Sequence, residues 1–478
     1  MSILERGWLG KVAAILALAL AAAGNAHAAA KIVILNGNAA GVGFNDPAPV
    51  EPIGGNAGRT LGAQRLIAFQ HAADIWGSTI NSSVTIRIAA TFEPLPCNAT
   101  GAVLGAAGAI EIFTDFPNAP KAGTWYPGAL ASKLAGTDVA SPGQAHIRAR
   151  FNSRIGLFPD CLPDLPFYLG VDNQHGNRID LVAVLLHEIA HGLGFQSFTD
   201  EETGEQFDKL PSIWDFFLVD SRNDKLWADM KNEERRLSAI SGPFLAWNGP
   251  RVTAAVPKVL RPESNLAISG PAAGSTAGNY EVGDALFGPE LNQDAVAGEL
   301  MPVVDQPEGS GLACTPLSVQ NALAVRGNIA LVDRGDCAFV IKARIVQEAG
   351  ARAMVVAENT PGPVTPLRGD DDDVRIPSVR ISYEAGKALK QVLARRSRTK
   401  SGVIASLGVD PTRLAGTDSK KRIRMHSPVE YQPGSSVSHY TVDARPNQLM
   451  EPAINQDLPH EVKPPRDLTY PLLQDIGW

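Results

Sequence analysis

The stretch His187-Glu-Ile-Ala-His-Gly-Leu-Gly-Phe195 sets two histidines and a glutamate at helical spacing. His187 and His191 are four residues apart, so on a helix their imidazoles lie on one face, where two neutral ring nitrogens can bind one zinc ion. Glu188 stands beside them, where it can accept a proton from a zinc-bound water. An apolar run beginning after Asp180, a helix-capping residue, leads into the motif and predicts a buried helix. A core helix with two incidental histidines is the alternative.

A catalytic zinc ion takes three protein ligands and leaves one position for water. Proteases with a His-Glu-x-x-His-x-x-Gly pattern usually have the third histidine at the position that Ser197 occupies here. In thermolysin-like enzymes a glutamate on a following helix serves instead. Three glutamates stand nearby: Glu201, Glu202 and Glu205. Gly192 and Gly194 argue against that alternative, because they are expected to end the helix and permit a sharp turn. The third ligand is therefore expected from further along the chain.

Among the remaining histidines, His439 is the best candidate for the third ligand. Met450 follows it by eleven residues, in a segment expected to form a turn. This is the arrangement of metzincins, in which a tight turn carrying a methionine forms an apolar floor under three imidazoles. His426 is the main rival ligand, and His460 is a more distant one. The alternative is that His439 is a surface loop residue.

The first 28 residues have the pattern of a secretory signal peptide. Arg6 and Lys11 precede the apolar run 12–21, and Ala26-His-Ala28 is a small-x-small cleavage site. The apolar run is too short to span a membrane, although an anchored N-terminus is the alternative. We expect a secreted protein, extracellular or periplasmic, without a membrane anchor after cleavage. The net charge of −7 is spread without a basic stripe, so no nucleic-acid partner is expected.

Before the zinc motif, the pattern predicts an α+β arrangement. The spacing of apolar residues predicts an amphipathic helix over residues 61–77, and alternating apolar and polar residues predict a strand over residues 84–92. A second alternating strand around residues 146–151 precedes the helix with the zinc motif. A twisted sheet with an active-site helix is therefore expected. We expect the strand at 146–151 to form the sheet edge along which an extended peptide pairs.

The composition changes after residue 250, and residues 251–284 are expected to be a linker rich in Pro, Gly, Ala and Ser. Strands alternate with helices over residues 285–410, which predicts a separate, small α/β unit. This segment resembles the protease-associated domain in Gly327-Asn-Ile-Ala-Leu-Val-Asp-Arg-Gly-Asp-Cys-Ala-Phe339 and in Ile376-Pro-Ser-Val-Arg-Ile-Ser382. In that family the domain has no catalytic residues, and the resemblance implies a module that binds substrate or controls access to a protease.

The rest of the chain resembles the leishmanolysin-type metzincins. Typical members of that family contain more cysteines than this chain. The resemblance rests on four stretches: residues 187–195, Ser435-Ser-Val-Ser-His-Tyr440, Asn447-Gln-Leu-Met-Glu-Pro452 and Leu468-Thr-Tyr-Pro-Leu-Leu-Gln-Asp-Ile-Gly-Trp478. It implies a metzincin-like catalytic domain in two parts, residues 29–250 and 411–478, interrupted by the protease-associated domain. That family also silences its zinc with a cysteine in the pro-segment, and no cysteine lies between Ala29 and Cys97.

An even number of cysteines in an exported chain suggests two disulfides, with three possible connectivities. The cysteines are Cys97, Cys161, Cys314 and Cys337. Proximity in sequence and the domain division favour Cys97–Cys161 and Cys314–Cys337. No Cys-x-x-Cys pair occurs, which argues against a thiolate zinc site.

These patterns together predict a secreted zinc-dependent endopeptidase acting on protein or peptide substrates. His187, His191 and His439 would hold one catalytic zinc ion, and Glu188 would be the general base. A non-proteolytic binding or adhesion protein with a structural zinc site is the alternative. An aminopeptidase is a weaker one, because the two-metal ligand set of aminopeptidases with such domains is not found. The acidic run 370–373 favours a solvated turn over a calcium loop, whose oxygen ligands are more widely spaced.

Overall fold

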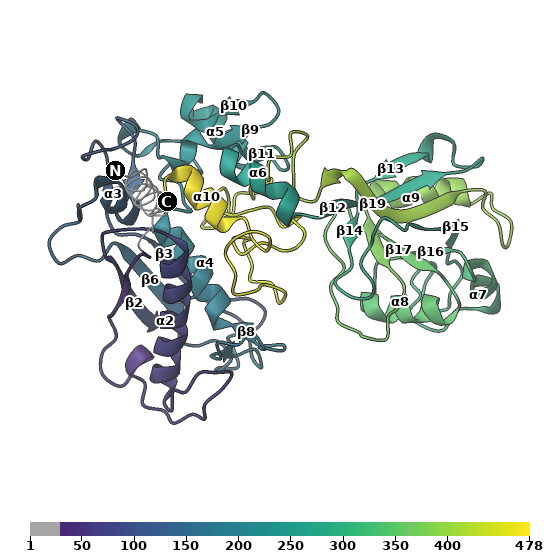
Figure 1. Cartoon of the computed structure of the whole chain (residues 1–478). Helices are drawn as coiled ribbons and strands as arrows, with labels where there is room; N and C mark the ends of the chain where they lie inside the picture. Colours follow the sequence, from purple (N-terminus) through teal and green to yellow (C-terminus); the bar gives the residue numbers. More distant parts are fainter. Residues whose placement is uncertain (1–28, 363) are drawn as a thin grey trace, which may run out of the picture. The chain divides into compact units, whose positions relative to one another are not determined.

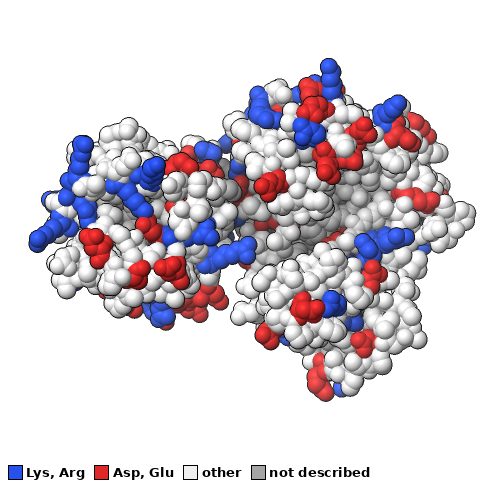
Figure 2. Space-filling model, turned by 180° about the vertical axis from the view of Figure 1, so that it is seen from behind, with Lys and Arg blue, Asp and Glu red and all other residues white. Residues whose placement is uncertain are grey.

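A computed structural model describes residues 29–362 and 364–478, so the expected signal peptide lies outside the described residues. The described chain forms two compact units (Figure 1). One, here called the split unit, contains the chain up to Val259 and again from Gly416 to Trp478. The other, the inserted unit, contains Leu260–Ala415. Within the described residues, no helix has the length and apolarity that a membrane span requires. Figure 2 shows both acidic and basic side chains on each unit.

The split unit is built on a four-stranded sheet with the order β1-β2-β6-β3. Its strands are β1 (Ile32–Asn36), β2 (Ile86–Glu93), β6 (Ile147–Asn152) and β3 (Gly105–Ala109). The first three are parallel, and β3 pairs antiparallel with β6. The expectation that residues 146–151 form a sheet edge is wrong, because β6 has a partner on each side. Alternation of apolar and polar residues indicates which face of a strand is buried, but it does not indicate how many strands flank that strand.

Two helices pack together beside this sheet (Figure 1). Helix α2 (Leu61–Thr79) is capped by Thr60, whose hydroxyl accepts a hydrogen bond from the Ala63 N–H. Helix α4 (Leu181–Leu193) contains the zinc motif, contacts β3 and β6, and is buried along its whole length. The indole N–H of Trp76 on α2 donates to the Leu186 carbonyl of α4 at 3.0 Å. This bond fixes the two helices to each other in a buried environment.

Shorter elements complete the split unit. They are the 3₁₀ turns η1 (Gly43–Asn45), η2 (Phe207–Lys209), η3 (Trp214–Phe216) and η4 (Trp227–Asp229), the helices α3 (Gly128–Ala135), α5 (Asn232–Ala239), α6 (Pro250–Val259) and α10 (Thr469–Ile476), and the strands β4 (Ile112–Phe113), β5 (Tyr126–Pro127), β7 (Phe167–Tyr168), β8 (Ile179–Asp180), β9 (Leu218–Asp220), β10 (Lys225–Leu226) and β11 (Leu245–Trp247).

The returning segment, residues 416–478, packs against the end of α4. The indole N–H of Trp478, the last residue, donates to the Leu193 carbonyl at 2.7 Å. The rings of Phe195 and Tyr440 lie edge to face with centroids 5.1 Å apart, and Phe195 also contacts Trp214 at 4.8 Å. Aromatic burial of this kind is a large stabilising contribution, so the region after the zinc motif and the returning segment share one core.

The inserted unit is an eight-stranded mixed sheet with the order β13-β12-β19-β15-β16-β17-β18-β14. Strands β15 to β18 run parallel to one another, and β19 pairs antiparallel with β12 and β15. Separate apolar clusters cover the two faces of the sheet. The elements are β12 (Pro262–Ser269), η5 (Gly274–Thr276), β13 (Gly278–Tyr280), β14 (Gly283–Asp284), β15 (Val296–Pro302), α7 (Val319–Val325), β16 (Ile329–Asp333), α8 (Phe339–Glu348), β17 (Ala353–Ala357), β18 (Ser378–Ile381), α9 (Tyr383–Leu393) and β19 (Ile404–Leu414).

The linker expected over residues 251–284 is folded instead. Its first residues belong to α6, and the remainder contains β12, η5, β13 and β14. Strand β12 pairs along its length with β19, over 130 residues later in the chain, from Pro262 opposite Leu414 to Ser269 opposite Ile404. The residues near β12, rich in Gly, Pro and Ala, contain no local pattern that predicts pairing with such a distant strand.

The two expected disulfides are confirmed. Cys97 is bonded to Cys161 in the split unit, and Cys314 is bonded to Cys337 in the inserted unit. Each bridge lies within one unit, as the domain division implied.

Candidate metal centre

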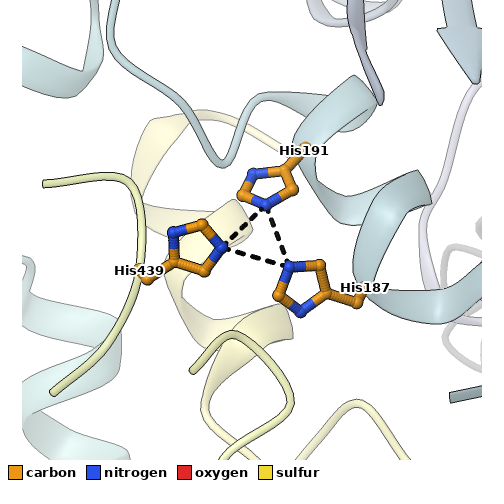
Figure 3. Close-up of side chains that lie close together, drawn as sticks. All are labelled: His187, His191 and His439. Carbon is orange, nitrogen blue, oxygen red and sulfur yellow. Dashed lines mark hydrogen bonds between the residues drawn. The ribbon is translucent and has the colours of Figure 1, made fainter. Parts of the chain in front are cut away.

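Three imidazoles converge in the split unit (Figure 3). The Nε2 atoms of His187 and His191, one turn apart on α4, are 3.1 Å apart. The Nε2 atom of His439, from the returning segment, lies 3.2 Å from each of them. All three side chains are buried. The histidines that the sequence names as ligands are therefore brought together.

A backbone carbonyl lies opposite the Nδ1 atom of each ring. His187 Nδ1 lies 2.8 Å from the Leu449 carbonyl, His191 Nδ1 lies 2.7 Å from that of Phe195, and His439 Nδ1 lies 2.9 Å from that of Ser435. A carbonyl only accepts hydrogen bonds, so Nδ1 bears the proton in each ring and Nε2 bears a lone pair. Burial lowers the pKa of His187 to about 3 and that of His191 to about 4, and it lowers the pKa of His439 well below its usual value.

Three lone pairs pointing at one another without a proton between them repel, and a cation at their centre removes that repulsion. In a tetrahedral zinc site with Zn–N bonds of about 2.05 Å, the nitrogens are roughly 3.3 Å apart. The Nε2 triangle here has edges of 3.1 to 3.2 Å. Over residues 29–362 and 364–478, no other group of three or more histidine, cysteine or acidic side chains is close enough to hold a metal. The donor set and spacing fit one zinc ion.

The two glycines of the motif have different roles. Gly192 is still helical, and a Cβ there would come within 2.3 Å of Ile147 on β6, so glycine allows α4 to lie against the sheet. Gly194 ends the helix with φ 127°, a conformation that L side chains rarely adopt. The chain then turns so that the Phe195 carbonyl reaches back to His191. The expected helix end is found at Gly194, while Gly192 serves close packing.

The third histidine is held in place by hydrogen bonds from a neighbouring loop. The Glu201 carboxylate accepts from the hydroxyls of Ser438 and Tyr431, each at 3.2 Å. Burial raises the pKa of Glu201 to about 8. In addition, the His439 carbonyl accepts from the backbone N–H of His426 at 2.8 Å. Glu201 thus supports the segment that carries His439 and does not face the three nitrogens.

The rival ligands point elsewhere. His426 Nε2 lies 3.0 Å from the Gln432 side-chain oxygen. His460 Nε2 lies 2.7 Å from Asp180, the residue that caps α4. Neither ring belongs to the three-nitrogen group.

Met450 is fully buried in the turn that follows the third histidine. The backbone of this turn contacts both ligand-bearing segments. The Leu449 carbonyl accepts from His187, and the Met450 carbonyl accepts from the N–H of Tyr440 at 2.7 Å. The Leu449 N–H in turn donates to the buried Asp467 carboxylate at 2.7 Å. The turn therefore connects α4 to the segment of His439 through main-chain bonds.

Glu188 is buried beside the edge strand β3. Its carboxylate accepts a hydrogen bond from the Ala107 N–H, and burial raises its pKa to about 8. A Cβ at Gly105 would lie 2.9 Å from Glu188 Cγ. The sequence patterns above did not predict β3. Its composition, Gly105-Ala-Ala-Gly-Ala109, nevertheless indicates a strand that lies close to another group. A strand made only of small residues fits where backbone must come close to another group.

Solved structures overlap with the chain only slightly. A zinc aminopeptidase from Bacillus subtilis has 21% identity, covers 33% of this chain and 36% of its own, and has a TM-score of 0.22. A subtilisin-like protease from an Antarctic Pseudoalteromonas has 18% identity, coverages of 31% and 34%, and a TM-score of 0.23. Both are peptidases, but overlaps of this size establish neither the fold nor the activity of the present chain.

Each of the curated relatives matches less than a third of the chain. Vacuolar-sorting receptor 2 of Arabidopsis thaliana is 29% identical over 142 residues, which are 28% of this chain and 22% of the receptor. Signal peptide peptidase-like 2 of the same plant is 33% identical over 92 residues, 19% of this chain and 16% of that protein. A probable lipoprotein aminopeptidase of Mycobacterium tuberculosis is 34% identical over 98 residues, 20% and 19% of the two chains. The chain spans less than a quarter of the length of each.

One family model matches, that of the PA domain, over residues 296–389. The matched residues run from β15 to α9 and lie entirely in the inserted unit. They include both stretches that carry the sequence resemblance, residues 327–339 and 376–382. The chain therefore carries a protease-associated domain, set within a mixed α+β structure.

Proposed function

We propose that this chain is a zinc-dependent endopeptidase of the metzincin type, similar to leishmanolysin. One observation carries the proposal: three buried imidazoles, each with Nδ1 bonded to a carbonyl, point their Nε2 lone pairs at one position. Among the described residues, no fourth histidine, cysteine or acidic side chain joins these three to complete a four-ligand site. A structural zinc site is normally closed by a fourth protein ligand, whereas a catalytic site leaves a position for water.

His187, His191 and His439 would hold the zinc ion, which supplies a Lewis acid and a water of lowered pKa. With zinc bound, the neighbouring positive charge would oppose the effect of burial on the pKa of Glu188. The ionised carboxylate would then accept a proton from the attacking water and return it to the nitrogen of the departing amine. Its bond from the Ala107 N–H positions the carboxylate for both transfers. The Met450 turn keeps the His187 ring in one orientation through the Leu449 carbonyl.

The free edge of β3 is the proposed binding site for the substrate backbone. Strand β3 pairs only with β6 within its sheet, and one of its N–H groups, that of Ala107, bonds Glu188. The other groups along its outer edge can add one extended strand by main-chain hydrogen bonds. Its residues are glycine and alanine, so the side chains of β3 itself leave room for a peptide backbone beside this strand. This favours extended, unfolded protein segments as substrates, consistent with export through the expected signal peptide.

Glu188→Gln tests the assignment of the base. The variant is expected to bind one zinc per chain like the wild type, because the three imidazoles are unchanged. Casein hydrolysis is expected to fall by about 10²- to 10⁴-fold, the usual contribution of general acid–base catalysis. Metal analysis and fragment release, with a chelator-treated sample as reference, provide the two measurements. Undiminished hydrolysis would refute the role of Glu188.

His439→Ala tests the third ligand, and His426→Ala is its matched control. Loss of one imidazole is expected to abolish stoichiometric zinc binding in the first variant and to leave it unchanged in the second. An N-acetylated, C-amidated peptide then separates the endopeptidase from an aminopeptidase, which needs a free amino terminus. Zinc binding without cleavage of any substrate would favour the non-proteolytic binding protein.

A further inference from the structure

Lys342, on helix α8 of the inserted unit, is fully buried. Its Nζ donates to the Leu312 carbonyl and lies 3.4 Å from Sγ of Cys314. Cys314 is bonded to Cys337. Among the described residues, no carboxylate lies within ion-pair distance of Lys342. A buried ammonium without a direct counter-ion is costly, and here the nearest group that can become an anion is a sulfur.

Two of the three acidic groups that act on Lys342 are engaged with other partners. Asp333 forms an ion pair with Lys390. Glu308 accepts from the Cys314 N–H at 2.9 Å and from the Thr315 hydroxyl at 2.8 Å. These two carboxylates and that of Asp336 raise the pKa of Lys342 from a distance, against the larger lowering by burial. Glu308 opposes a negative charge on Cys314, and the Leu312 and Gly335 carbonyl oxygens lie 3.8 and 3.7 Å from its sulfur. Lys342 supplies the positive charge that contacts this sulfur.

We propose that Cys314–Cys337 is an exchangeable disulfide, a modification site for small thiols and dithiols, in which Lys342 stabilises the thiolate of Cys314. An ammonium in contact with a sulfur stabilises the thiolate and makes that sulfur the better leaving group. Stabilising the reduced form also makes a disulfide easier to reduce at equilibrium.

The exchange consists of two displacements at sulfur. The thiolate of an external dithiol attacks Sγ of Cys337, and the new S–S bond forms as the Cys337–Cys314 bond breaks. The electron pair of the broken bond remains on Cys314, opposite the Lys342 ammonium. The second thiol of the reagent then displaces Cys337, which leaves two reduced cysteines and one oxidised dithiol. Both protein cysteines are partly exposed, so a small reagent can reach them.

The second disulfide is a control within the same molecule. Cys161 of the Cys97–Cys161 pair is fully buried, and among the described residues no lysine or arginine donates to either sulfur. The proposal therefore predicts two disulfides of different stability in one folded chain.

A dithiothreitol titration of the full-length protein at pH 8 tests this. Free thiols are trapped by alkylation and assigned by mass spectrometry. Cys314–Cys337 is expected to open at about tenfold lower dithiothreitol concentration than Cys97–Cys161. Lys342→Met is expected to raise the midpoint of Cys314–Cys337 towards that of the other pair. Lys387→Met, which removes an exposed lysine from helix α9 of the same unit, is expected to leave it unchanged.

The sign of the Lys342→Met effect separates the proposal from simple destabilisation. A loosened fold would lower the dithiothreitol midpoint, whereas loss of the ammonium raises it. Equal midpoints for the two disulfides, or an unchanged midpoint in folded Lys342→Met, would overturn the proposal. A measurement on wild type avoids the variant: limiting glutathione is expected to form its mixed disulfide on Cys337, and an adduct on Cys314 would contradict the assignment.

Discussion

At the scale of single residues, the three ligand histidines differ in how their rings are oriented, although each uses the same kind of partner. His191 bonds the Phe195 carbonyl within its own helix end, and His439 bonds the Ser435 carbonyl four residues before it. Only His187 depends on a distant segment, through the Leu449 carbonyl. The orientation of the metal site is therefore tied to the turn that carries Met450.

Gly105→Ala is expected to lower casein hydrolysis by about ten- to a hundredfold without loss of zinc, because misplacement of a catalytic group costs this much. The new Cβ would lie 2.9 Å from Glu188 Cγ and 3.1 Å from its Oε1, so the carboxylate must move. Gly101→Ala is the control, since a Cβ there meets nothing closer than 4.0 Å. Hydrolysis rates and zinc content of both variants provide the check, and equal rates would show that Glu188 tolerates the displacement.

Glu451→Gln is expected to flatten the pH dependence of stability. Burial raises the pKa of Glu451 to about 8, so between its unfolded value of 4.5 and pH 8 the folded chain retains a proton that the unfolded chain has lost. Stability from this group is complete below pH 4.5 and is lost as the pH rises towards 8.

Urea unfolding at pH 5.5 and pH 8.5 measures the effect. The free energy of unfolding should fall with pH by at least about 1 kcal/mol more in the wild type than in Glu451→Gln. Parallel pH profiles for the two proteins would mean that Glu451 is already ionised in the fold.

At the scale of elements, helix α4 carries two of the three proposed ligands and the proposed base. It is buried throughout, and its first-turn N–H groups are bonded to the Asp180 carboxylate, at 2.9 Å for Val182. The other oxygen of Asp180 lies 2.7 Å from Nε2 of His460, in the returning segment. One carboxylate thus caps the zinc helix and connects it to the distal part of the chain.

Asp180→Ala is expected to destabilise the split unit by about 1 to 2 kcal/mol, the usual cost of removing a helix N-cap. Asp180→Asn retains a capping oxygen and is expected to cost less. Urea denaturation with tryptophan fluorescence measures both. If the two variants lost equal stability, the contribution would come from the contact with His460 rather than from the cap.

At the scale of the whole molecule, the inserted unit enters and leaves the chain at one place. The Ala415 N–H donates to the Arg261 carbonyl at 2.9 Å, and Pro262 stands opposite Leu414 in the β12–β19 pair. An insertion whose ends are adjacent closes no long loop in its host, so it need not disturb the host fold.

Joining Val259 to Gly416 by a short Gly/Ser linker is therefore expected to give a folded protein that still binds one zinc. Cleavage of a short, unfolded peptide is expected to persist, because all proposed catalytic groups are in the split unit. Zinc analysis, circular dichroism and the blocked-peptide assay test this. A folded deletion protein without zinc would show that the third histidine requires the inserted unit.

The sequence by itself determined what depends on a few neighbouring residues: the helix at Asp180, the shared face of His187 and His191, the end of the helix at Gly194, and the pairing of cysteines within each unit. Only the tertiary structure decided that the His439 ring lies 3.2 Å from the helix pair, that β3 rather than β6 forms the sheet edge, and that residues 262–269 are a strand. The physical reason is the distance along the chain between the residues that interact. Helical periodicity, capping and turn formation are local interactions, whereas strand order and the approach of His439 result from packing between segments up to 252 residues apart.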